Sequence, residues 1–387
     1  MLYPLHELHR LTSDAVSAWT ELLRHAPLPW VRAQASLLHR ITKGYPKPLF
    51  GIPGVVEEVI LIRPFCRLVH FVAPHERAVP RGGARRVMVV APLSGHHATL
   101  VRDTVATLLQ DHDVYVTDWI DARDVPVAHG TFSLDDYVSE LRGFIHHLGA
   151  AELHIVAVCQ PTVPALAAVA LDAAAGVPAP RSLVLMGGPV DARRNPTVVD
   201  KLATDHPLAW FEHQMIHRVP ERYAGAGRRV YPGFLQLSAF VMMNPDKHAQ
   251  AYWQYWLARL RGDELAAAQH EKFYDEYNAV LDMDAQYYLD TVRLVFQEFA
   301  LARGTWRVRG ELVDPSRITA TPIFAIEGEL DDISGLGQTA AALELASNAP
   351  GKRQLVAAGC GHYGLFSGSR WRDAIYPEVR SFIGEHA

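Results

Sequence analysis

Cysteine is scarce in this sequence of 387 residues, which contains only three. Cys66, Cys159 and Cys360 form an odd set spread along the chain, so a disulfide framework is not expected. This pattern favours a reducing compartment, and we expect a cytoplasmic protein. In such a compartment a thiol can serve as a nucleophile without being lost to a disulfide.

Long apolar runs and a surplus of basic residues are also absent. No run of about 18 apolar residues occurs, so we expect no membrane span. Residues 1–10 mix charges into their leucines, unlike a signal peptide. The formal net charge of −5 argues against a nucleic-acid partner. Paired histidines lack the spaced partners of a metal site, and neither a metal nor a cofactor is expected.

The first 56 residues form a region of their own. Leucines and other apolar residues recur at helical spacing up to about residue 25, which predicts an amphipathic helix. Five prolines between residues 27 and 53 then indicate a connector. We interpret residues 1–56 as a helical clasp and connector that packs on the main domain.

Short apolar runs then alternate with helix-like stretches. Such runs cover residues 86–91, 114–117, 153–158, 182–187, 322–327 and 353–357. Apolar runs without alternation indicate parallel strands that are buried on both faces. Two earlier β-rich runs, 59–62 and 69–72, would give the sheet an antiparallel start. The sequence therefore predicts an α/β protein with a mostly parallel, doubly wound sheet, built from residues 57–191 and 316–387.

Residues 192–315 interrupt this series and are rich in aromatic residues and helix formers. We interpret the segment as a mostly helical insertion that caps the C-terminal ends of the strands. Most of its aromatic side chains are expected to pack helices together, and a minority to face a cleft.

Cys159 occupies the most informative turn, between the predicted strand that ends at Val158 and a helix rich in alanine and leucine. A nucleophile at such a turn is the elbow of the α/β-hydrolase fold, and the helix N-terminus behind it stabilises a thiolate. The usual elbow is G-x-S-x-G, whereas Ala157 and Pro161 flank the cysteine here. The structural alternative is a buried cysteine that acts as a small hydrophobic residue.

An acid and a histidine follow later strands in the order that α/β-hydrolases use. Asp331 comes first after a short glycine-containing turn and is the expected partner of the histidine. Asp332 is the fallback, although we favour a helix N-cap for it. His362 lies on a loop among three glycines, just past the last predicted strand. These residues predict a nucleophile, an orienting acid and a general base.

The loop 91–97 follows another predicted strand, and in this fold such a loop supplies a second N–H group to an oxyanion. We expect Leu93 or Ser94 to donate it, beside the backbone N–H of Gln160. The alternative is an ordinary turn between a strand and a helix.

Several long strings closely resemble intracellular polyhydroxyalkanoate depolymerases. The strings are Cys159–Pro164 (CQPTVP), Gly328–Gly335 (GELDDISG), Gly361–Gly364 (GHYG), Ala91–His97 (APLSGHH), Tyr115–Arg123 (YVTDWIDAR) and Phe273–Asp282 (FYDEYNAVLD). The resemblance covers nearly the whole chain. It implies an α/β-hydrolase fold with a helical cap, and a cysteine triad of Cys159, Asp331 and His362.

The same resemblance implies an esterase that acts on stored poly(3-hydroxybutyrate) or similar polyesters at the granule surface. Three residues within the matching strings are expected to contact the substrate, namely His96, Trp119 and Tyr363. CoA is a further potential acyl acceptor. The sequence fixes neither the monomer side chain nor the choice between hydrolysis and thiolysis.

Two other functions fit parts of the pattern. Polyhydroxyalkanoate synthases, to which these depolymerases are related, would use the same triad to elongate a polymer from hydroxyacyl-CoA. Their elbows usually read G-x-C-x-G, unlike the surroundings of Cys159. A granule-binding protein without catalysis is the third reading, and the complete triad speaks against it.

Overall fold

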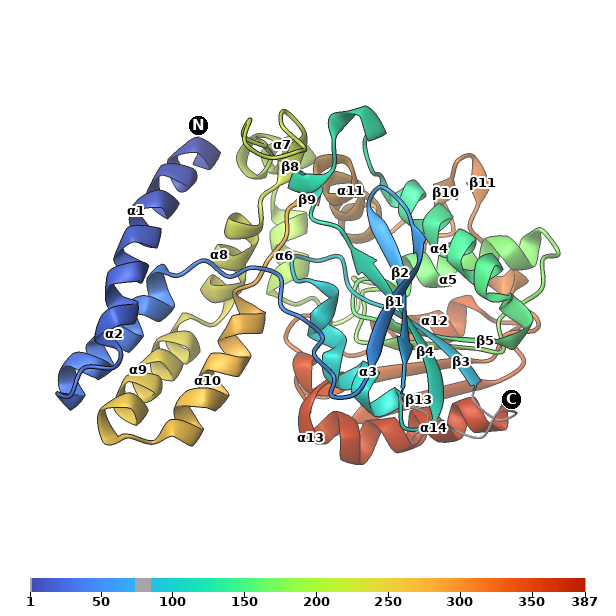
Figure 1. Cartoon of the computed structure of the whole chain (residues 1–387). Coiled ribbons are helices and arrows are strands. Elements are labelled where there is room, and N and C mark those ends of the chain that lie inside the picture. Colours follow the sequence, from blue (N-terminus) through green and yellow to red (C-terminus); the bar gives the residue numbers. More distant parts are fainter. Residues whose placement is uncertain (1, 74–84, 387) are drawn as a thin grey trace.

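A central sheet of eight strands organises the computed structural model, which describes residues 2–73 and 85–386 (Figure 1). The strand order is β1-β2-β4-β3-β5-β6-β12-β13. The strands are β1 Val56–Ile62, β2 Cys66–Val72, β3 Arg85–Val90, β4 His112–Trp119, β5 Leu153–Val158, β6 Ser182–Met186, β12 Ile323–Gly328 and β13 Lys352–Ala357. β2 is antiparallel to β1 and β4, and the other neighbours are parallel. The predicted strands and the predicted α/β-hydrolase fold are confirmed.

Helices cover both faces of this sheet, so successive side chains of its strands are buried on opposite sides. Val87 and Val89 face the cluster that includes α3 and α14, whereas Met88 and Val90 face the cluster with α4 and α5. This two-sided burial explains why these strands read as unbroken apolar runs. The helices of this part are α3 Arg102–Leu108, α4 Leu134–Leu148, α5 Thr162–Ala174, α12 Ala341–Leu345, α13 Gly368–Arg370 and α14 Tyr376–Glu385.

The segment between β6 and β12 is mostly helical, as the sequence predicts. Its helices are α6 Val198–Asp205, α7 Leu208–Met215, α8 Gly233–Met243, α9 Pro245–Arg261, α10 Glu264–Tyr277 and α11 Ala285–Asp290, and a π-helical stretch follows over Thr291–Gln297. Its short strands are β7 His217–Arg218, β8 Arg229–Tyr231, β9 Met283–Asp284, β10 Arg307–Val308 and β11 Glu311–Leu312. None of the helices in the described ranges combines the length and the hydropathy needed to cross a membrane.

The N-terminal region forms two helices, α1 Leu2–Leu23 and α2 Pro29–Thr42. The second helix corrects our interpretation of this stretch as a connector, because Pro29 stands at the start of the helix, where a missing N–H costs nothing. Figure 1 shows α1 and α2 beside α9 and α10, away from the sheet. The buried Arg40 fixes this arrangement through an ion pair with Asp275 at 2.5 Å.

Candidate active site

Cys159 lies at a sharp turn between β5 and α5. Its φ of 67° is in the left-handed region, which few residues other than glycine adopt. Its backbone N–H still donates to the carbonyl of Met186, at 2.7 Å, so the turn continues the hydrogen bonding of the sheet. This geometry is that of the nucleophile elbow, in which a strained backbone projects the side chain away from the sheet.

Two glycines after β6 make room for the elbow. A Cβ atom on Gly188 would lie 2.3 Å from the carbonyl oxygen of Cys159 and 1.8 Å from Oγ1 of Thr162. A Cβ atom on Gly187 would lie 2.7 Å from Cδ1 of Leu365, and the φ of 57° at Gly187 is in the left-handed region. Both positions therefore need glycine. Sequence reasoning missed them, although a Gly-Gly pair directly after a strand could have signalled a close approach.

Asp331 and His362 meet beside the elbow. Oδ2 of Asp331 lies 2.8 Å from Nδ1 of His362, and both side chains are buried. The backbone N–H groups of Ile333 and Ser334 each donate to Oδ1 of Asp331 at 2.9 Å, which holds the carboxylate in place. Asp332 points elsewhere and accepts a hydrogen bond from Asn244 at 3.3 Å. The structure thus pairs His362 with Asp331 and not with Asp332.

The charge state of His362 depends on its two neighbours. Burial lowers the pKa of the imidazole, but the neighbouring Cys159 and the hydrogen-bonded carboxylate of Asp331 outweigh this effect. The pKa of His362 is therefore raised well above its ordinary value. A histidine held between a carboxylate and a thiol is the arrangement that a cysteine nucleophile requires.

The three residues predicted to form an oxyanion hole lie in the same part of the molecule as Cys159. Gln160, Leu93 and Ser94 all line the same cavity as the thiol. Among the described residues, none of their backbone N–H groups has a hydrogen-bond acceptor. The loop is held in place at Leu93, whose carbonyl accepts from the hydroxyl of Tyr287 at 2.9 Å. Free N–H groups next to a nucleophile suit a developing negative charge.

The thiol and the imidazole lie in a cavity of about 410 Å³, a size typical of small-ligand sites. Cap residues from α6, α7, α8, α11 and the π-helical stretch form its other wall. That wall carries no charged side chain, and its lining is mostly aliphatic and aromatic, with Leu202, Phe211, Phe240, Met243, Tyr287, Val292 and Phe296 as examples. The cavity therefore suits an apolar acyl chain next to the nucleophile.

Of the three residues predicted to contact the substrate, two line the cavity and one does not. His96 and Tyr363 line the cavity. Trp119 does not, because this last residue of β4 points into the core between the sheet and α4. Its side chain is 1% exposed, its indole stacks on Tyr137, and its N–H donates to the carbonyl of Ala91 at 2.8 Å. The prediction for Trp119 is wrong, and the residue instead supports the start of the oxyanion loop.

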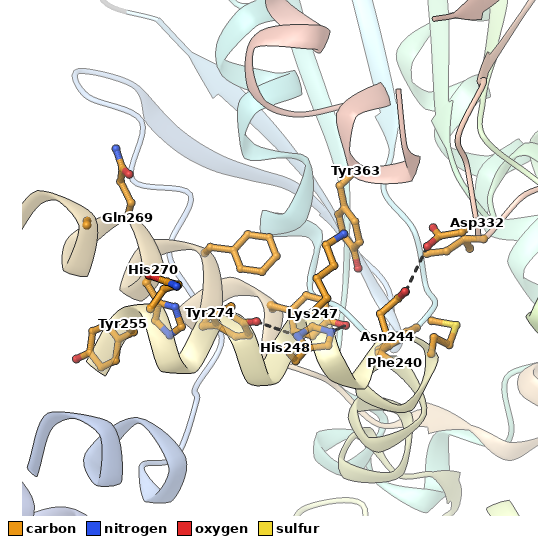
Figure 2. A pocket seen from close by; sticks show the side chains of 17 residues that line it. Phe240, Asn244, Lys247, His248, Tyr255, Gln269, His270, Tyr274, Asp332 and Tyr363 are labelled. Atoms are coloured by element: carbon orange, nitrogen blue, oxygen red, sulfur yellow. Dashed lines mark hydrogen bonds between the residues drawn. The ribbon is translucent and has the colours of Figure 1, made fainter. Parts of the chain in front are cut away.

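A second hollow of about 470 Å³ lies between α9, α10 and the loop that follows β12 (Figure 2). We call it the α9–α10 groove. Its lining is aromatic and polar, and consists of Phe240, Met243, Asn244, Lys247, His248, Ala251, Gln254, Tyr255, Ala266, Gln269, His270, Phe273, Tyr274, Tyr277, Asp332, Ile333 and Tyr363. The sequence did not predict this groove, because helical periodicity does not show where two neighbouring helices leave a space between them.

The other two cysteines differ from Cys159 in their surroundings. Cys66 and Cys360 are free and buried, and burial raises the pKa of each thiol. In residues 2–73 and 85–386, no three His, Cys, Asp or Glu side chains are grouped to hold a metal ion.

Comparisons with solved structures return α/β proteins at low sequence identity. DcsB, solved in complex with its substrate analogue, is 16% identical with a TM-score of 0.49, and the match covers 86% of this chain and 98% of DcsB. The BphD hydrolase of Rhodococcus sp. strain RHA1 is 14% identical with a TM-score of 0.46, over 85% and 99% of the two chains. A thermophilic esterase from Thermogutta terrifontis is 13% identical with a TM-score of 0.44, over 86% and 98%.

A search of curated protein sequences finds no match. A family model described as the C-terminus of PHB de-polymerase matches residues 187–387, more than half of the chain. The matched region contains the cap, Asp331 and His362, and the elbow with Cys159 lies before it. The chain belongs to the PHB depolymerase family, and it is an ester hydrolase.

Proposed function

We propose that this enzyme cleaves ester bonds of stored poly(3-hydroxybutyrate) or related polyesters through an acyl intermediate on Cys159. The observation that carries the proposal is the position of Cys159, which stands at a strained elbow beside the His362–Asp331 pair in an apolar cavity. Membership of the PHB depolymerase family supports the same substrate class.

In the first half of the reaction, His362 accepts the proton of Cys159, and the thiolate attacks the carbonyl carbon of the ester. The N–H of Gln160, with that of Leu93 or Ser94, stabilises the oxyanion of the tetrahedral intermediate. The intermediate then collapses to a thioester, and His362 gives its proton to the departing alkoxide of the chain.

In the second half, His362 removes a proton from water, which attacks the thioester and releases the hydroxy acid and the thiol. The thiol of CoA in place of water would release a hydroxyacyl-CoA instead. Asp331 keeps the imidazole in the required tautomer and stabilises its charged form, because its carboxylate is fixed by two backbone N–H groups.

The lining of the cavity supports a polyester substrate. An ester chain is uncharged and carries apolar branches, and the cap wall offers mostly aliphatic and aromatic surface without a charge. Action on an insoluble polymer would place the enzyme at the surface of polyhydroxyalkanoate granules in the cytoplasm.

The test is the release of 3-hydroxybutyrate and its oligomers from amorphous poly(3-hydroxybutyrate) granules, with and without CoA. We expect release by the wild type and none by Cys159→Ala, which keeps the fold but lacks the nucleophile. A requirement for CoA would assign thiolysis. Equal release by both proteins would refute Cys159 as the nucleophile. Polymer growth from hydroxyacyl-CoA would identify a synthase.

A further inference from the structure

We propose that the α9–α10 groove is a second binding site, which holds the length of an uncharged polyester chain that extends beyond the cavity. This inference rests on the proposed function, since only a chain longer than the cavity needs a second site. It adds a prediction that the catalytic residues alone do not make, namely a preference for long substrates.

The groove adjoins the cavity that contains Cys159. Four residues line both hollows, namely Phe240, Met243, Ile333 and Tyr363. Tyr363 directly follows His362, and in Figure 2 its side chain lies on the sheet side of the groove, opposite α9. A chain bound at the thiol would have to pass these shared side chains to reach the groove.

Aromatic rings continue from Tyr363 along the groove. The ring of Tyr277 lies 6.2 Å from that of Tyr363, and the ring of Phe273 stacks on Tyr277 at 5.5 Å. Beyond them, His270 lies 4.4 Å from Tyr274 and 4.5 Å from Tyr255. Tyr255, Tyr274 and Tyr277 are buried, so Phe273, which is 48% exposed, offers most of the apolar surface of this row. Such a surface does not fix the register of a chain, which suits a polymer of identical units.

One polar cluster of the groove, formed by His248, Tyr274 and Tyr277, suits a ligand that accepts hydrogen bonds. His248 lies between two phenols, with Nδ1 2.8 Å from the hydroxyl of Tyr274 and Nε2 3.2 Å from that of Tyr277. Burial lowers the pKa of His248, so its ring is neutral and donates to one phenol while it accepts from the other. The phenol that accepts keeps its own O–H for another acceptor. A polyester chain presents carbonyl oxygens, which are acceptors.

The charges of the groove favour a neutral chain over CoA. The lining contains one lysine, Lys247, and one carboxylate, Asp332. Recognition of the phosphates of CoA usually requires several cationic side chains, and a lone lysine opposite a carboxylate does not supply them. We therefore assign the groove to the polyester and not to the acyl acceptor.

The test compares two tryptophan substitutions on α9. Ala251 lines the groove, whereas Ala249 lies on the same helix, is exposed and lies outside the lining. For each protein, the ratio of kcat/KM for a hexamer of 3-hydroxybutyrate to kcat/KM for p-nitrophenyl butyrate is measured. We expect Ala251→Trp to fill the groove and lower this ratio about tenfold, because binding energy remote from the reacting bond is lost. Ala249→Trp should keep the wild-type ratio.

Phe273→Ala provides a second variant on an exposed position, should Ala251→Trp fold poorly, and it should lower the same ratio. An unchanged ratio in both groove variants, with the hexamer still cleaved, would overturn the groove alone. Cleavage of p-nitrophenyl butyrate without any cleavage of the hexamer by the wild type would instead overturn the proposed function, and the groove with it.

Discussion

The cavity has two walls, one formed by loops that follow strands of the sheet and one formed by the cap, and they supply different kinds of side chain. The sheet wall supplies the proposed nucleophile, acid and base, since Cys159, Asp331 and His362 all follow strands. Its backbone is constrained, as the left-handed Cys159 and the crowded Gly188 show. The cap wall supplies uncharged side chains on helices. This division suggests that changes to the sheet wall abolish the reaction, whereas changes to the cap wall alter which ester is used.

The largest effect should come from the acid of the sheet wall. Asp331→Asn should lower kcat for p-nitrophenyl butyrate by roughly 10³–10⁴-fold, because the amide no longer fixes the tautomer or stabilises the imidazolium. Asp332→Asn is the matched control at the neighbouring position, and its loss should be far smaller. Comparable losses in the two variants would contradict the pairing of Asp331 with His362.

The second largest effect should come from a substitution that crowds the elbow, and it should lower the stability of the protein. Gly188→Ala places a Cβ atom against the backbone of Cys159, and the free energy of unfolding should fall by about 3 kcal/mol or more. In Gly384→Ala, near the end of α14, the added carbon meets no neighbour within 4 Å, and the variant should be as stable as the wild type or slightly more. Urea unfolding followed by circular dichroism compares the two. Equal midpoints would show that the elbow is less crowded than described.

The pH dependence of the reaction should reveal the ion pair on the sheet wall. Because the pKa of His362 is raised, its protonated form persists above the ordinary value of 6.5 and remains available to the leaving alkoxide. We therefore expect kcat/KM to stay constant as the pH rises above about 6.5. It should fall only when the pH passes the raised pKa of His362. The same sign applies to stability, since the pair contributes fully below 6.5 and its contribution is lost as the imidazolium deprotonates.

Cys159→Ser sharpens this prediction. Without a thiolate, one of the charges that raise the pKa of His362 disappears, so the pKa falls. A serine needs a neutral imidazole as its base, and the residual activity should therefore rise with pH through this lower pKa. Profiles of the same shape for both proteins would argue against a thiolate–imidazolium pair.

Changes to the cap wall should redirect specificity rather than stop the reaction. Phe296 lies on the π-helical stretch and lines the cavity. Phe296→Ala should enlarge the cavity and raise the preference for hexanoate over butyrate p-nitrophenyl esters by about tenfold. Leu312→Ala, in the exposed hairpin of β10 and β11, should leave that preference unchanged. A collapse of kcat for both esters in Phe296→Ala would break the division between the walls.

The same division explains what could be predicted from the sequence. Strands buried on both faces are predicted from local apolar runs, and each residue of the predicted triad follows its own strand. Chain order therefore made Cys159, Asp331 and His362 candidates, and the resemblance to polyhydroxyalkanoate depolymerases strengthened the prediction. The faces of the cap helices are set by contacts that are remote in sequence. For example, α2 lies within a proline-rich stretch, packs on α9, and is tied to α10 by the ion pair between Arg40 and Asp275. No local pattern indicates that pairing.

Trp119 shows the same limit on a smaller scale. Its position at the end of β4 fits a residue near the active site, and the site is indeed close, since its N–H bonds the carbonyl of Ala91. The direction of its side chain depends on Tyr137 of α4, against which the indole stacks. Sequence reasoning located the right strand end but could not determine on which side of the sheet the indole lies.

The smallest predicted effect concerns the loop that the two walls share. Tyr287 of the cap donates its hydroxyl hydrogen to the carbonyl of Leu93, whereas Trp119 of the core donates to Ala91 in the same loop. Removing one such bond costs about 1 kcal/mol, so Tyr287→Phe should lower kcat roughly fivefold with little change in KM, because the oxyanion donors are held less firmly.

A double variant tests whether the loop acts as one unit. If it does, the free-energy equivalent of the loss in kcat for Tyr287→Phe combined with Trp119→Phe should exceed the sum of the two single effects. Strict additivity would mean that each wall holds its own part of the loop, and the division between the walls would then extend to the oxyanion hole itself.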